Sequence, residues 1–111
     1  MKGTFRLSVL ILLLIPVVAL ALPVNFGLHN KSVKPLGAVT LYYQGGQSTI
    51  NVNSQGNWTT ETPGTVTGVS INGQRSDYPV SRDVTLPSGS KVKVNWKSTN
   101  LIEVIDIATQ G

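Results

Sequence analysis

Residues 38–60, AVTLYYQGGQSTINVNSQGNWTT, decide the fold of this chain. Apolar and polar residues alternate through this stretch, which is the pattern of strands with one buried face. Gly45 and Gly46 interrupt the pattern, and glycine accepts the positive φ of a two-residue hairpin turn. A hairpin is therefore predicted between residues 38–44 and 47–53. Its two predicted apolar pairs are Leu41 with Ile50 and Val39 with Val52.

A second turn is predicted at Ser54-Gln55-Gly56, since a three-residue loop that ends in glycine is another common hairpin connection. This loop would place Trp58 opposite Val52 in a third strand. The predicted core face of the three strands is Val39, Leu41, Tyr43, Ile50, Val52 and Trp58. The predicted polar face is Thr40, Tyr42, Gln44, Gln47, Thr49, Asn51, Asn53 and Thr59.

The rest of the chain continues the two-residue alternation. Asn72-Gly73 is a strong hairpin signal between residues 65–71 and 74–78, and Pro79 limits the second of these strands to an edge or an end. A turn at Pro87-Ser88-Gly89 joins residues 83–86 to 91–97, with Val84 opposite an apolar residue. Residues 101–108 form a more apolar strand that is predicted to be central.

With residues 23–28 as a first strand, the count reaches eight or nine. Short strands at roughly ten-residue spacing predict an all-β fold, a small antiparallel β-sandwich of immunoglobulin-like or transthyretin-like type. The segment VTLPSG at residues 84–89, followed by VKV at 92–94, resembles the strand-turn-strand of many secreted sandwiches of these two types. This resemblance covers about a dozen residues and implies no functional residues.

Residues 1–21 have the three parts of a secretory signal peptide: basic Lys2 and Arg6, an aliphatic run, and small residues at Ala19 and Ala21. Cleavage is predicted after Ala21, with Ala19 as the alternative. Residues 22–111 are then a single secreted or periplasmic domain without a membrane span. Removal of Lys2 and Arg6 lowers the net charge of +4, so nucleic-acid binding is not expected. The chain has no cysteine, so a packed core must stabilise it.

No catalytic, metal-binding or cofactor-binding arrangement is predicted, and the protein is not expected to be an enzyme. His29 has no second histidine or cysteine to complete a metal site or triad, and it is interpreted as a loop residue. The acidic residues are interpreted as solvated surface charges. A weak loop Ca²⁺ site at Asp77 and Asp83 is the alternative. The five acids are Glu61, Asp77, Asp83, Glu103 and Asp106.

Two surfaces are candidates for binding. The first is the predicted polar face, on which lie Tyr42, Gln44, Thr49 and Asn51. Their amides, hydroxyls and exposed ring could bind a sugar. A sheet face that is simply solvated would have the same composition. Lys91, Lys93 and Lys97 form a basic stripe on one strand, suited to an anionic glycan, lipopolysaccharide or acidic protein. Solubility, or protection of an edge strand, is the alternative explanation for the stripe.

The predicted function is therefore a non-catalytic module that binds a protein or polysaccharide at the cell surface, after export from the cytoplasm. Two alternatives come from other classes of protein. One is a structural subunit that assembles by β-strand addition through its terminal strands. The other is a small protein inhibitor that presents a hairpin loop to a protease.

Overall fold

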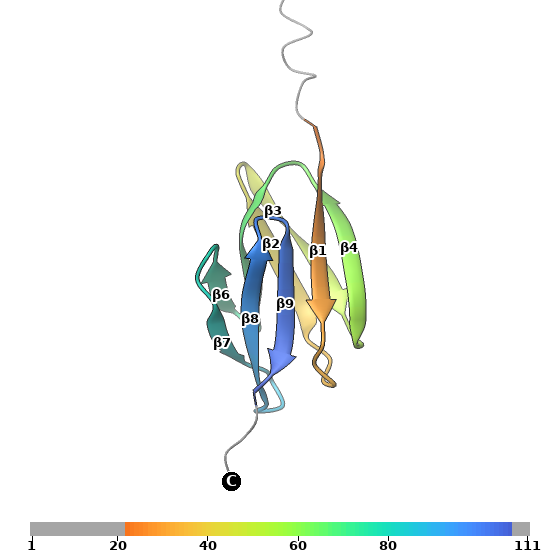
Figure 1. Cartoon of the computed structure of the whole chain (residues 1–111), viewed down its shortest axis with the longest axis vertical. Helices are drawn as coiled ribbons and strands as arrows, with labels where there is room; N and C mark the ends of the chain where they lie inside the picture. The colour runs from red at the N-terminus through yellow and green to blue at the C-terminus, as the bar shows by residue number, and fades with distance from the viewer. Residues whose placement is uncertain (1–21, 108–111) are drawn as a thin grey trace, which may run out of the picture.

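The computed structural model describes residues 22–107, and these residues form a two-layer β-sandwich without a helix (Figure 1). The predicted signal peptide, residues 1–21, and Ala108 of the last predicted strand lie outside the described residues. One sheet has the strand order β4-β1-β9-β8-β7, and the other has the order β3-β2-β5-β6. The nine strands are β1 (Val24–Asn30), β2 (Gly37–Tyr43), β3 (Gly46–Val52), β4 (Gly56–Thr62), β5 (Val66–Ile71), β6 (Gln74–Asp77), β7 (Arg82–Thr85), β8 (Lys91–Ser98) and β9 (Leu101–Asp106).

The core lies between the two sheets, and the alternation of the sequence explains it. Each strand turns every second side chain inward, so both sheets contribute aliphatic residues to one dry layer. The predicted small antiparallel β-sandwich is thus confirmed. Fully buried hydrophobic residues include Phe26 and Leu28 of β1, Val39 and Leu41 of β2, Val69 and Ile71 of β5, Val92 and Val94 of β8, and Ile102 and Val104 of β9.

The two terminal strands lie in the interior of the five-stranded sheet. Strand β9 is its central strand, as predicted, and pairs with β8 on one side and with β1 on the other. The β1–β9 pair is parallel, and β1 is antiparallel to β4 on its other side. Because β1 extends to Asn30, the loop interpretation of His29 is wrong: this residue lies within the strand, between Asn57 and Glu103.

The first hairpin exists, but its predicted register is wrong by two residues. Its turn is Gln44-Gly45, so Val39 lies opposite Ile50, and Leu41 lies opposite Ser48. Only Gly45 has a positive φ at this turn (91°), so one glycine suffices and Gly46 begins β3. A shift of two residues keeps every side chain on its predicted face, because the side-chain period of a strand is also two.

The predicted second hairpin is also wrong, because β3 and β4 belong to different sheets. Residues 53–55 cross from one layer to the other, and Trp58 lies opposite Leu28 of β1 instead of Val52. One long-range and one local hydrogen bond hold this crossing. The side-chain amide of Asn30 and the indole N–H of Trp58 both donate to the Ser54 carbonyl, at 3.1 and 3.3 Å. Trp58 still faces the core, but from the opposite sheet.

The other two predicted hairpins are confirmed. Asn72 and Gly73 have φ values of 52° and 72°, which form the turn between β5 and β6. The β7–β8 hairpin places Val84 opposite Val92, an apolar pair as expected. Within residues 22–107, no helix is long and apolar enough to cross a membrane.

The strands β6 and β7 close one side of the sandwich. The side-chain amide of Gln74 donates to the Thr85 carbonyl at 2.8 Å and accepts the Thr85 N–H at 3.0 Å, so it binds the edge of β7 as another strand would. The Arg82 guanidinium donates to the Arg75 carbonyl of β6. The edge strands β3 and β4 lie on the other side, and Figure 1 shows β4 away from β6 and β7.

Candidate binding surface

The predicted polar face is the outer face of the four-stranded sheet, but its residues do not form one cluster. Thr49 and Asn51 lie on the edge strand β3, where the Thr49 hydroxyl is 3.1 Å from that of Thr40. Gln44 lies in the exposed β2–β3 turn. Tyr42 extends in the other direction, toward β5 and β6. The residues that it contacts there were not singled out by the sequence.

A glycine in β5 leaves room for the side chains of Asp77 and Arg75 beside Tyr42. Gly68 of β5 lies opposite both Tyr42 and Asp77. The Tyr42 hydroxyl extends diagonally to the Ser70 hydroxyl, at 3.2 Å. A Cβ atom at Gly68 would collide with Oδ1 of Asp77 and would lie 3.1 Å from Nε of Arg75. The missing side chain therefore makes the space in which three strands bring their polar groups together.

Arg75 of β6 occupies this space. Its guanidinium carbon lies 4.0 Å from the centroid of the Tyr42 ring, a cation–π contact, and its Nε donates to Oδ1 of Asp77 at 2.6 Å. The side chains of Arg75 and Asp77 remain 47% and 64% exposed. Both can therefore still bind a ligand, although their positions are fixed. We call Tyr42, Gly68, Ser70, Arg75 and Asp77 the Tyr42–Arg75 cluster.

A hollow adjoins the cluster under the β6–β7 connection. It has a volume of about 330 Å³. The connection is anchored from inside, since the Ser76 hydroxyl donates to the Val80 carbonyl and accepts the indole N–H of Trp96. The exposed Tyr78 ring meets Trp96 edge to face, with centroids 5.5 Å apart. The hollow is lined by Arg75, Ser76, Asp77, Tyr78, Val80, Ser81 and Arg82.

A second hollow, of about 390 Å³, lies between the β1–β2 and β7–β8 connections. Its walls are mostly apolar and include Pro35, Leu36, Leu86 and Pro87. Specific recognition needs a few polar groups at fixed positions, and the Tyr42–Arg75 cluster supplies more of these. We therefore regard the cluster, rather than the larger hollow, as the candidate site.

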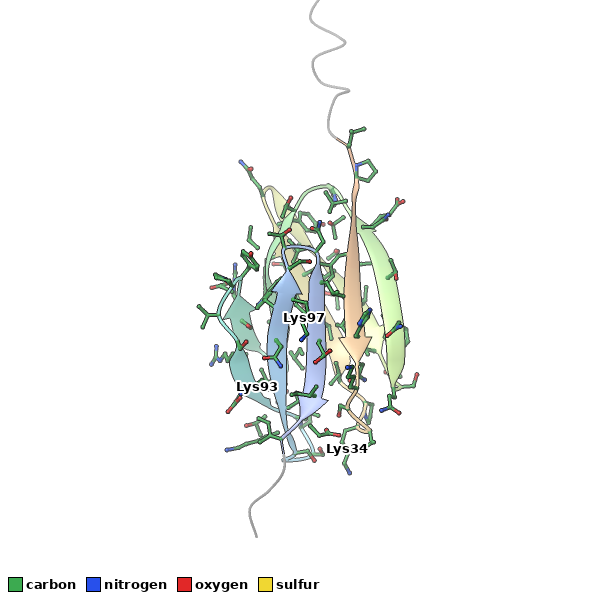
Figure 2. The ribbon with its side chains drawn as sticks, viewed as in Figure 1. Lys34, Lys93 and Lys97 are labelled. Atoms are coloured by element: carbon green, nitrogen blue, oxygen red, sulfur yellow. The ribbon has the colours of Figure 1, made fainter. Side chains whose placement is uncertain are left out.

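The basic stripe lies on the outer face of the five-stranded sheet, where Figure 2 shows Lys93 and Lys97 of β8. An acidic residue lies beside two of its three lysines. Glu103 of β9 is 3.9 Å from the Lys97 ammonium, and Asp83 lies opposite Lys93 in the β7–β8 register. Lys91 lies opposite Thr85. These acids reduce the positive potential that an anionic ligand would meet.

Glu103 is the centre of this charged surface. Its Oε2 atom is 3.0 Å from the Lys31 ammonium, and its side chain is only 15% exposed. The hydrogen bond from Lys31 is the main reason that the pKa of Glu103 lies below its ordinary value of 4.5. The charges of Lys31, Lys97 and His29 lower this pKa further, against the opposing effect of desolvation.

We expect NMR titration to find the pKa of Glu103 below 4.5, and Lys31→Met to raise it toward that value. Lys97→Met should have a smaller effect, because the Lys97 ammonium is 3.9 Å from the carboxylate. With a lowered folded-state pKa, the ion pair stabilises the fold above pH 4.5, and this contribution is lost as the pH falls through the folded pKa. An unchanged Glu103 pKa in Lys31→Met would contradict this assignment.

The remaining titratable residues do not assemble into a metal centre in the part of the chain that the structure describes. No group of three or more His, Asp or Glu side chains there could hold a metal ion. Asp77, half of the hypothetical Ca²⁺ site, is paired with Arg75. As expected from their spacing, Glu103 and Asp106 point to opposite sides of β9: Glu103 contacts Lys31, whereas Asp106 accepts a hydrogen bond from Ser32.

The chain matches no protein-family model, no curated protein and no solved structure. The geometry of the cluster is therefore the basis on which a function is assigned. Two of its residues, Arg75 and Asp77, lie on one face of a predicted strand, and the Asn72-Gly73 turn fixes the register that places Gly68 opposite Asp77. That signal was present in the sequence. The contact with Tyr42 depends on β2 and β6 being the two neighbours of β5.

Proposed function

We propose that this protein is a non-catalytic binding module of the cell surface or periplasm, and that the Tyr42–Arg75 cluster binds a polysaccharide. The observation that carries the proposal is the Arg75 side chain, stacked on Tyr42 and hydrogen-bonded to Asp77 while 47% of its surface is exposed. A binding site gains affinity when its polar groups are held in position before the ligand arrives.

The chemistry of the cluster favours a neutral, hydroxyl-rich ligand over an anion. Arg75 and Asp77 together carry no net charge, but they present N–H donors beside carboxylate acceptors. Each hydroxyl of a sugar can both donate and accept a hydrogen bond, so adjacent hydroxyls match such a pair. Direct stacking of a sugar on Tyr42 is less favoured, because the Arg75 guanidinium lies over the ring.

The proposal is tested with the processed protein on insoluble cellulose, chitin and starch and on purified peptidoglycan. We expect retention on at least one of these polymers, and we expect Arg75→Ala to weaken it tenfold or more, because the main donor is lost. Tyr42→Ala should weaken binding through loss of the stacked position of Arg75. Tyr42→Phe, which keeps the ring, should weaken it less.

Lys97→Ala is the matched control, because it removes an exposed cation of another ion pair on the opposite sheet. It should leave retention within twofold of the wild type. Two results would refute the proposal: no retention on any of the four polymers, or loss of retention in Lys97→Ala with Arg75→Ala unaffected. The second result would place binding on the basic stripe.

A further inference from the structure

The two sides of the sandwich differ in how their edge strands are protected. On one side, β6 and β7 have four residues each, contain Arg75, Asp77, Arg82 and Asp83, and are joined by side-chain hydrogen bonds. Short, charged strands of this kind prevent edge-to-edge pairing. On the other side, β3 and β4 have seven residues each, without proline, and Glu61 is their only charged residue. Within residues 22–107, the second side therefore has longer and less charged edge strands than the first.

The backbone of β4 is oriented for pairing at its free edge. The N–H groups of Gly27 in β1 and of Lys31, which directly follows it, donate to the carbonyls of Asn100 and Val104, on the β9 side of the strand. Gly27 lies opposite Thr59. In an antiparallel pair, when the backbone N–H and C=O groups of one residue point away from the partner strand, those of the residue opposite it also point away. The N–H and C=O groups of Thr59 are therefore directed outward, and the same parity directs those of Asn57 and Glu61 outward.

The sequence of β4 is complementary to itself in the antiparallel direction. A two-fold axis at Thr59 places Thr59 opposite its own copy, and Asn57 opposite Glu61 on both sides of the axis. The Asn57 amide can donate to the Glu61 carboxylate, and no like charges meet. A threonine pair of this kind already exists within the molecule, where the hydroxyls of Thr40 and Thr49 are 3.1 Å apart.

Apolar surface lies beside the same edge. Trp58 and Ile50 are the partly buried hydrophobic residues of β4 and β3 that pack against the core. In the two-fold arrangement, Trp58 lies opposite Thr60 of the second copy, so strand addition would also cover part of the indole. The terminal strands β1 and β9 cannot serve in this way, because each already has a paired neighbour on both sides.

We propose that β4 is a homodimer interface, in which a second copy of this chain adds its own β4 antiparallel to the first and joins the two five-stranded sheets. The Tyr42–Arg75 cluster lies at the opposite side of the sandwich, so the dimer would present two such clusters. This inference does not depend on the polysaccharide proposal, and either can fail alone.

Sedimentation equilibrium of the processed protein over a concentration series tests the interface. We expect a monomer–dimer equilibrium, weakened tenfold or more by Thr59→Lys, which places two like charges opposite each other at the axis. Thr59→Pro should act similarly. It removes only an outward N–H and leaves the β1–β4 ladder intact, so circular dichroism should show a folded domain.

Thr49→Lys is the matched control at the middle of the other long edge strand, β3, and it should change the dimer dissociation constant less than twofold. A wild-type protein that stays monomeric at every concentration would overturn the proposal. So would a dimer that Thr49→Lys dissociates and Thr59→Lys leaves intact, since the interface would then be β3.

Discussion

Phe26→Ala should destabilise the domain by about 3–5 kcal/mol, which is the usual cost of removing a buried phenylalanine. Phe26 is fully buried at the centre of β1 and meets Trp96 edge to face, with ring centroids 6.2 Å apart. Truncation leaves a cavity between the two sheets and removes this aromatic contact. Small domains are stable by about 5–15 kcal/mol, so the loss is a large part of the total.

Urea denaturation, followed by far-ultraviolet circular dichroism and tryptophan fluorescence, measures this effect. The expected result is a lower midpoint with an unchanged slope, because the surface exposed on unfolding changes little. Val33→Ala is the control, since Val33 is 73% exposed and its truncation should cost less than about 0.5 kcal/mol. If Phe26→Ala costs less than about 1 kcal/mol, Phe26 is not part of a packed core.

Local turn chemistry made much of this fold predictable. Asn72-Gly73 and the turn at residues 87–89 specify their hairpins through residues that lie within the turns themselves, and both predictions are confirmed. At residues 54–56 the local signal was misleading. Alternation shows that Trp58 faces the core, but it does not show from which sheet. The choice depends on Asn30, 24 residues away, whose amide binds the Ser54 carbonyl.

The candidate site was predictable in part for the same reason. The sequence placed Tyr42 on a polar sheet face, because this prediction needs only the two-residue alternation within a single strand. It did not predict that Arg75 would lie over the Tyr42 ring, because that contact requires the order β2-β5-β6 and the absence of a side chain at Gly68. Similarly, Lys97 was predicted on an outer face, but its neighbour Glu103 comes from another strand.

A polar contact holds the β1–β2 connection to the end of β9. Its removal should lower the stability of the domain, though by less than Phe26→Ala does. The buried Ser32 hydroxyl donates to Oδ1 of Asp106 at 2.6 Å, and the Val33 N–H donates to Oδ2 at 3.0 Å. The same hydroxyl oxygen accepts the Lys34 N–H at 3.0 Å. We expect Asp106→Ala to cost about 1–3 kcal/mol, because it leaves a buried hydroxyl without its acceptor.

The pH dependence of stability separates this contact from simple packing. The hydrogen bond from Ser32, followed by that from the Val33 N–H, lowers the pKa of Asp106 below its ordinary value of 3.8. A carboxyl group with a lowered folded-state pKa stabilises the fold above its unfolded pKa, and this contribution is lost as the pH falls through the folded pKa. The stability difference between the wild type and Asp106→Asn should therefore be constant from pH 7 to about pH 5.

Below pH 3.8 the two stability curves should converge, because the wild-type carboxyl becomes protonated and loses its charge-assisted hydrogen bonds. Chemical denaturation at closely spaced pH values measures both curves. Asp83→Asn, at an exposed position of β7, is the control and should match the wild type at pH 7. A stability difference between the wild type and Asp106→Asn that persists undiminished well below pH 3.8 would show that the charge of Asp106 is not its source.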